Sequence, residues 1–304
     1  MSPIKRFLLM LALTAMWSPS FLFIKLAIED FPPMVAVSLR LTIAAVIMGF
    51  ILLYKGYSFP KDRGFWIRAS VMAVFSSSLP FALFCIAEQW IESSLAAILN
   101  GMSPMFTVIL AQMFVPSDRL NINKVVGITL SMAGMVLLFL PQLQNGIDAT
   151  VVGMAAVVFA TFCYAVGHIF GKLFSMNMKP YVTPTAQFII SSLILWPFAI
   201  FNGDVARMTM PSASAIVGVC GLGIFGTVCA FIIYYKLLES SGPTAISTVA
   251  CFFPVMGMLL GFIFLGESLT TVGLAASGII LLGMLTVNEV IDLRSRNVTE
   301  VEEA

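Results

Sequence analysis

The chain is a succession of long apolar stretches separated by short polar ones. Ten apolar stretches are present, and each runs for roughly 17–24 residues, the length that a helix needs to cross about 30 Å of hydrocarbon. Since backbone hydrogen bonds must close within each segment in lipid, the pattern predicts ten transmembrane helices. Their approximate bounds are 7–28, 33–54, 65–87, 92–114, 124–140, 150–173, 181–202, 213–236, 243–265 and 270–290.

Positive charge alternates between the loops that join these segments. With the N-terminus inside, the side opposite the cytoplasm carries only Lys25 and Arg207, and Arg40 lies deep within a helix. The excess of lysine and arginine in cytoplasmic loops therefore predicts that both termini are cytoplasmic. The cytoplasmic set is Lys5, Arg6, Lys55, Lys61, Arg63, Arg68, Arg119, Lys124, Lys172, Lys179, Lys236, Arg294 and Arg296.

Composition supports a lipid environment. The chain is 60% hydrophobic and 10% charged, with a mean hydropathy of +1.01, whereas soluble domains are about 45–50% apolar and about 25% charged. A net charge of +1 without a basic patch predicts no nucleic-acid partner. The five cysteines lie in apolar runs without metal or redox spacing, so we expect neither a metal site nor a cofactor. The expected partners are the bilayer and a small-molecule substrate, and the expected state is a monomer or weak homodimer.

The two halves of the chain resemble each other at a shift of about 150 residues. We therefore predict a first five-helix repeat over 1–145, a second over 146–291, and an acidic cytoplasmic tail over 292–304. Because five is odd, the second repeat enters the membrane upside down. The predicted fold is an all-α polytopic membrane protein of ten transmembrane helices in two inverted five-helix repeats. Matching pairs include Trp17 with Tyr164, Lys25 with Lys172, Arg40 with Gln187, Phe81 with Phe231, Pro104 with Pro254, and Asp118 with Glu267.

Several short motifs resemble those of a known family. They are Trp17-Ser18-Pro19-Ser20-Phe21 with Lys25, Pro33 followed by Arg40, and Gly242-Pro243-Thr244 through Pro254 to Gly266-Glu267-Ser268-Leu269-Thr270. From Trp17 to about Gly283 the chain resembles the drug/metabolite transporter superfamily, specifically its EamA-like ten-helix members. The first repeat departs from that pattern at Pro116-Ser117-Asp118, where a Gly-Glu pair is usual. The resemblance implies transport of amino acids, nucleotide derivatives, amines or other metabolites, without naming a substrate.

Arg40 is the first candidate for a substrate-binding residue. It lies about seven residues into its helix, or about 10 Å from the interface at 1.5 Å per residue. An arginine at that depth costs several kcal/mol unless it faces a polar cavity or a partner. If it lines a cavity, its planar fork suits a carboxylate or phosphate of the substrate. The alternative is a structural arginine that snorkels to the interface or binds backbone carbonyls.

Other polar and aromatic side chains complete the expected site. Lys25 lies about one turn from the end of its helix, where it can also snorkel to the interface. His168 is the only histidine, and a gate or proton role competes with simple packing. The remaining candidates occupy helices that the family arranges around its cavity, although each can also be a packing contact. They are Trp17, Ser76, Asn100, Tyr164, Gln187 and Tyr234.

The absence of several motifs limits the possible classes of function. No glycine-rich ATP-binding loop and no hydrolase or metalloprotease motif occurs, so we expect a secondary transporter and not an enzyme. The expected substrates are amino acids or related carboxylate-bearing compounds, carried across the cytoplasmic inner membrane, with export preferred. One alternative is an uptake or exchange carrier for a nucleotide-like metabolite such as S-adenosylmethionine. The other is a channel or a non-transporting membrane scaffold.

Overall fold

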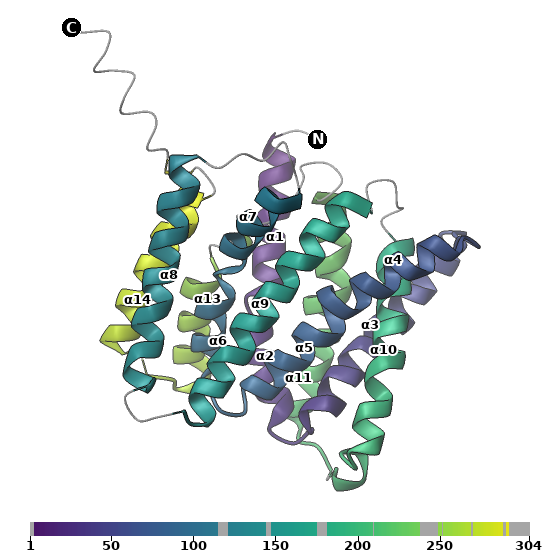
Figure 1. Ribbon diagram of the computed structural model, residues 1–304. Coiled ribbons are helices and arrows are strands. Elements are labelled where there is room, and N and C mark those ends of the chain that lie inside the picture. Colours follow the sequence, from purple (N-terminus) through teal and green to yellow (C-terminus); the bar gives the residue numbers. More distant parts are fainter. Residues whose placement is uncertain are drawn as a thin grey trace, which may run out of the picture.

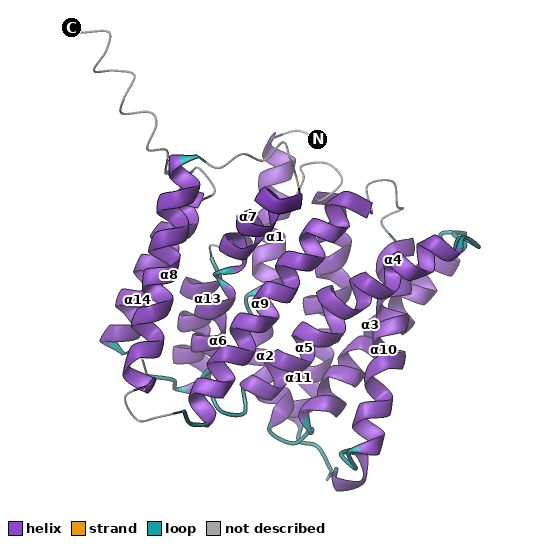
Figure 2. Ribbon diagram, viewed as in Figure 1, coloured by secondary structure: helices purple, strands orange, loops and turns teal. Residues whose placement is uncertain are grey.

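The computed structural model describes residues 3–114, 121–143, 147–174, 181–208, 210–237, 249–250, 252–268, 270–287 and 290–291. These residues form helices and connecting turns, and no strand occurs among them (Figure 2). The helices are α1 (Pro3–Trp17), α2 (Ser20–Ile28), α3 (Pro33–Tyr54), α4 (Arg63–Ala73), η1 (Val74–Ser78), α5 (Leu79–Ala87), α6 (Ser93–Asn100), α7 (Ser103–Phe114), α8 (Ile122–Leu143), α9 (Ala149–Phe174), α10 (Val182–Phe201), η2 (Val205–Arg207), α11 (Ala213–Gly223), η3 (Ile224–Cys229), α13 (Phe253–Leu260), η4 (Gly261–Leu265) and α14 (Thr271–Val287).

Within the described residues, these elements combine into ten apolar helical passes. Eight are long and apolar enough to span a membrane, from Leu8–Ile28 to Ala213–Leu237, and two are shorter apolar helices, Phe253–Leu265 and Thr271–Val287. The start predicted for the ninth segment, at 243, lies outside the described residues. α1 begins and α14 ends at the same end of the bundle, as an even number of passes requires (Figure 1). We call this the near end and the opposite one the far end.

Helices of one half pack on helices of the other half in a reciprocal pattern. The second pass (α3) packs against the seventh (α10), and the fifth (α8) packs against the tenth (α14). The third pass contacts the sixth through α5 and α9, and the eighth contacts the first through α11 and α2. This reciprocal pattern fits the predicted architecture of two inverted five-helix repeats. The residue boundaries of those repeats remain predictions, because 144–146 and 292–304 lie outside the described residues.

Helix geometry is interrupted at matching places in the two halves. Val74–Ser78 in the third pass and Ile224–Cys229 in the eighth are both π-helical turns, and they begin at equivalent positions of the two repeats. In the first case Pro80 supplies the cause, since proline cannot donate to the carbonyl four residues earlier. The first pass also breaks, where α1 ends at Trp17 and α2 begins after Pro19. Such interruptions of helix geometry are frequent at functional sites.

Candidate functional site

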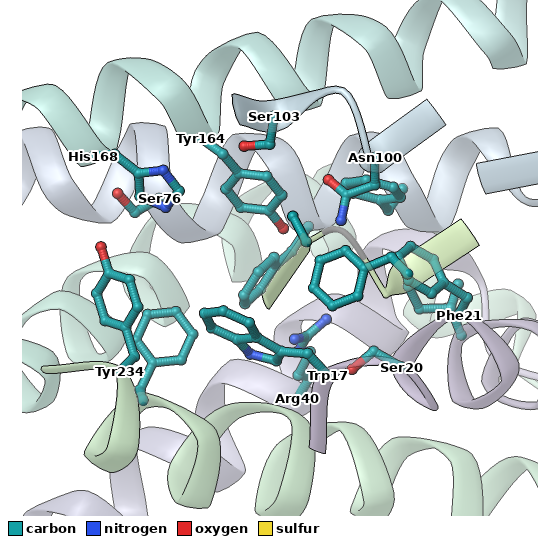
Figure 3. Close-up of a pocket in the computed structure, with 16 residues that line it drawn as sticks. Trp17, Ser20, Phe21, Arg40, Ser76, Asn100, Ser103, Tyr164, His168 and Tyr234 are labelled. Carbon is teal, nitrogen blue, oxygen red and sulfur yellow. The ribbon is translucent and has the colours of Figure 1, made fainter. Parts of the chain in front are cut away.

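A pocket lies in the middle of the bundle, beside the broken helices. It holds about 860 Å³ of space not filled by protein atoms, its opening included. Its walls come from both halves of the chain, as expected for a site between two repeats. The lining residues are Trp17, Ser20, Phe21, Ile24, Arg40, Ser76, Phe81, Phe84, Asn100, Ser103, Tyr164, His168, Phe231, Tyr234, Ala250 and Phe253 (Figure 3).

The structure brings seven of the nine candidate residues together at this pocket. They are Trp17, Arg40, Ser76, Asn100, Tyr164, His168 and Tyr234. Lys25 and Gln187 do not line it, and their side chains bind protein groups elsewhere.

Arg40 extends from α3 into the pocket, and its side chain is almost fully buried. Its Nε donates a hydrogen bond to Thr227 Oγ1 at 2.9 Å, and its Nη2 lies 3.5 Å from the Gly226 carbonyl oxygen. Its Cζ lies 3.6 Å from the ring centroid of Phe81, a cation–π contact. Nη1 donates to none of the described residues, and the guanidinium points toward the middle of the pocket (Figure 3). Part of the arginine fork therefore remains for a ligand.

Thr227 holds the arginine in that orientation. It belongs to the π-turn η3, and its own hydroxyl donates to the Leu222 carbonyl at 2.8 Å. With its proton committed to Leu222, the hydroxyl oxygen accepts from Arg40 Nε. The π-turn thus orients the only arginine or lysine among the described residues that line the pocket.

Aromatic rings make most of the remaining wall. Trp17 contacts Phe231 edge-on at 6.1 Å between centroids and Tyr234 at 5.7 Å. On another side, Phe84 stacks on Tyr164 with centroids 6.0 Å apart. These faces offer apolar contact and attract cations placed over them.

Two polar atoms in the pocket have unused hydrogen-bonding capacity. No described residue bonds to Asn100 Oδ1 or to Ser20 Oγ, although both atoms are buried. Buried polar atoms are usually paired, so unpaired ones at a pocket are candidates to bind ligand groups. Both can accept a hydrogen bond, and the serine can also donate one.

Gln187 has a different environment from its repeat counterpart Arg40. It is fully buried, donates from Nε2 to Ser77 Oγ, and accepts from the Tyr235 hydroxyl at 2.9 Å. Ser77 belongs to the π-turn η1, just as Thr227 belongs to η3. Gln187 therefore joins α10 to the third pass without facing the pocket.

Lys25 lies at the far end of α2. Its Nζ donates to the carbonyl oxygens of Glu88 at 2.5 Å and of Ile91 at 2.7 Å. These carbonyls follow the end of α5, where the last turn of a helix leaves acceptors without intrahelical donors. Lys25 thus ties the first pass to the turn between α5 and α6.

The predicted set missed much of the pocket wall. Phe84, Ser103 and Phe253 line the pocket but were not singled out. Ser20 and Phe21 were named only within a family motif and not as binding residues. The pair Phe81 and Phe231 did appear in the comparison of the two halves, which was the available signal. With 26 phenylalanines in the chain, aromatic identity alone selects no position.

Comparison with known proteins gives a consistent result. The sequence model of the EamA-like transporter family matches residues 5–140 and again residues 151–288. An uncharacterized transporter of Archaeoglobus fulgidus is 28% identical over 92% of this chain and 97% of its own. The uncharacterized inner membrane transporter YedA of Escherichia coli K12 is 23% identical over 91% of this chain and 88% of its own. A probable amino-acid metabolite efflux pump of Salmonella typhimurium is 24% identical over 91% of this chain and 92% of its own.

A solved crystal structure shares the fold. It has a TM-score of 0.69 and 17% sequence identity, and the match covers 96% of this chain and 100% of the other. At that identity the likeness concerns architecture alone.

Proposed function

Because the chain belongs to the EamA-like transporter family, we propose that it is a secondary transporter of small carboxylate-bearing metabolites, with Arg40 binding the carboxylate. The central pocket is the proposed binding site, and amino acids are the proposed substrate class. Trp17, Ser76, Asn100, Tyr164, His168 and Tyr234 form the rest of the proposed site. Lys25 and Gln187 support the surrounding helices and do not contact substrate in the conformation described.

The observation that carries this proposal is the charge of the pocket. Among the lining residues Arg40 is the only arginine or lysine, and none is an aspartate or glutamate. No described carboxylate forms an ion pair with Arg40. A buried cation without an anionic partner costs free energy that a substrate carboxylate would offset, and the guanidinium fork fits that group in two-point contact.

The rest of the pocket suits the remainder of an amino acid. A substrate ammonium group would find acceptors at Asn100 Oδ1 and Ser20 Oγ, and the face of Trp17 would attract it further. The aromatic walls would bury an apolar side chain. A dicarboxylate would leave its second charge without a basic partner in the pocket.

The direction and membrane follow from the relatives and from loop charge. YedA carries the name of an inner membrane transporter, and the Salmonella relative carries that of an efflux pump. We therefore propose export across the inner membrane, with the near end cytoplasmic and the far end outside. This orientation places the lysine- and arginine-rich loops inside.

Ligand-dependent thermal stabilisation of the purified protein tests the substrate class. A ligand that binds only the folded state adds about 2.7 kcal/mol at a concentration of 100 Kd, which raises the melting temperature. Apolar amino acids should stabilise the protein, and their carboxamide analogues, which lack the negative charge, should not. Nucleosides and S-adenosylmethionine belong in the same screen as competitors. Equal stabilisation by an amino acid and its carboxamide would contradict the role given to Arg40.

A further inference from the structure

A second unusual charge lies outside the pocket, at the far end of the bundle. Glu88 follows the last residue of α5, yet its side chain is 0% exposed. Neither Glu88 Oε1 nor Oε2 has a hydrogen-bond partner in the part of the chain that the structure describes. A buried carboxylate without any donor is rare, since burying an unpaired charge costs several kcal/mol.

Among the described residues, none of the charged groups near Glu88 forms an ion pair with its carboxylate. Lys25 of α2 donates its described hydrogen bonds to two backbone carbonyls and forms no ion pair with the Glu88 carboxylate. Glu267, which follows η4, accepts from the backbone N–H groups of Ser93 and Ser94 at 2.7 and 2.9 Å. Arg40 of α3 lies at the pocket and binds Thr227. The helix α6 contains no titratable side chain, and the first titratable side chain along α9 is that of Cys163.

These surroundings favour the protonated acid. Burial raises the pKa of Glu88 well above its ordinary value of 4.5, while the charge of Lys25 lowers it and that of Glu267 raises it further. A neutral carboxylic acid also removes the cost of an unpaired buried anion. In the conformation described, burial without a hydrogen-bond donor therefore favours the protonated form of Glu88.

The same residues join separate parts of the protein at the far end. Lys25 ties the first pass to the turn after α5, and Glu267 ties the second half of the chain to the start of α6. If the far end opens during transport, these links must part. Water would then reach Glu88, and the ammonium of Lys25, released from its carbonyls, would be free to pair with the ionised carboxylate.

We propose that Glu88 is a proton-binding site that takes up one proton each time the far end closes and releases it when the far end opens. On closure, a carboxylate oxygen gains the proton, Lys25 moves to the backbone carbonyls, and one negative charge is neutralised. On opening, the O–H bond breaks and the proton passes to water. The link to substrate movement rests on the proposed function, whereas the proton-binding site itself does not.

The pH dependence of stability tests the site without any substrate. Between pH 4.5 and the raised pKa, the folded protein holds a proton that the unfolded chain has lost, so stability falls as pH rises. Glu88→Gln removes this titration. Its melting temperature should exceed that of the wild type at pH 8, and the advantage should shrink toward pH 4.5.

Matched variants make the measurement decisive. Glu29→Gln changes an exposed carboxylate at the same end and should keep the wild-type profile. Glu88→Leu provides a second neutral variant if Glu88→Gln purifies poorly. A Glu88→Gln profile parallel to that of the wild type from pH 5 to pH 8 would overturn the proposal.

Transport in proteoliposomes tests the coupling separately. Wild-type flux should fall as the pH on the far side rises above the pKa of Glu88, by up to about tenfold per pH unit. Glu88→Gln should transport with little dependence on that pH. Active wild-type protein whose flux is independent of far-side pH would refute the coupling. Absence of any wild-type transport would instead count against the proposed function, and the stability profile would still decide the proton site.

Discussion

Arg40 donates to Thr227 at 2.9 Å, and the repeat counterparts of these two residues, Gln187 and Ser77, form the corresponding bond in the other half. In each case a residue of the second helix of one repeat binds a π-turn in the third helix of the other. The two interfaces differ in charge. The neutral Gln187 is satisfied by protein groups, whereas the guanidinium of Arg40 keeps donor capacity toward the pocket.

If this contact positions the arginine, Thr227→Val should weaken substrate binding. Valine keeps the shape of threonine but removes the acceptor for Arg40 Nε, so the guanidinium loses its fixed orientation. We expect a KM raised by roughly fivefold to tenfold, about 1–1.4 kcal/mol, with a smaller change in kcat. Thr227→Ser restores the hydroxyl and should restore KM. A kcat loss without a KM change, unrescued by serine, would contradict a positioning role.

Gln187→Leu should destabilise the protein. Leucine leaves the hydroxyls of Ser77 and Tyr235 without their described partner in a buried site. The cost of such unpaired groups is about 1–3 kcal/mol, seen as a lower melting temperature in detergent. Because Gln187 does not line the pocket, KM measured on the surviving folded protein should stay near the wild-type value. A large rise in KM with unchanged stability would return Gln187 to the binding site.

Glu267→Ala should loosen the far end. The Glu267 carboxylate accepts from Ser93 N and Ser94 N and so caps the first turn of α6, across the two halves of the chain. Loss of a helix cap costs typically about 1 kcal/mol, and the melting temperature should fall accordingly. Glu267→Gln retains one acceptor oxygen, so its melting temperature should lie between those of the alanine variant and the wild type. Equal stability of all three proteins would mean that the cap contributes nothing.

The orientation in the membrane can be tested with reporter fusions. Fusions within residues 58–62, 117–121 and 176–179, and at the C-terminus, should report a cytoplasmic location. Fusions within 145–148 and 204–207 should report from the other side. This pattern follows from the distribution of lysine and arginine. A single reporter on the wrong side would mean that a helix was miscounted.

Hydropathy was sufficient to predict the fold because lipid allows few alternatives. A chain that must satisfy every backbone group within an apolar segment forms helices, so segment length alone located the passes. The π-turns were harder to predict from the sequence. Pro80 indicates a break near the first π-turn. The corresponding residue of the second repeat is Ala230, which gives no such signal, so the second π-turn is seen only in the structure.

The candidate site was predictable at positions where a polar side chain in an apolar helix costs free energy. Arg40, Asn100 and His168 attract attention in a sequence because lipid penalises them, and all three line the pocket. Whether a polar side chain faces the pocket or binds another helix was less predictable from the sequence. Lys25 and Gln187 are equally polar, but the carbonyls at the end of α5 and the hydroxyl of Ser77 engage them.

The most direct test of the central claim is substrate counterflow into proteoliposomes by the wild type, Arg40→Lys and Arg40→Ala. The substrate is the amino acid that stabilises the wild type best, and folded protein is quantified in the same preparations. We predict that Arg40→Lys transports measurably less, because it keeps the charge but loses the planar fork, and that folded Arg40→Ala does not transport. Near-normal counterflow by folded Arg40→Ala would contradict the account, because the pocket would then bind its substrate without the arginine.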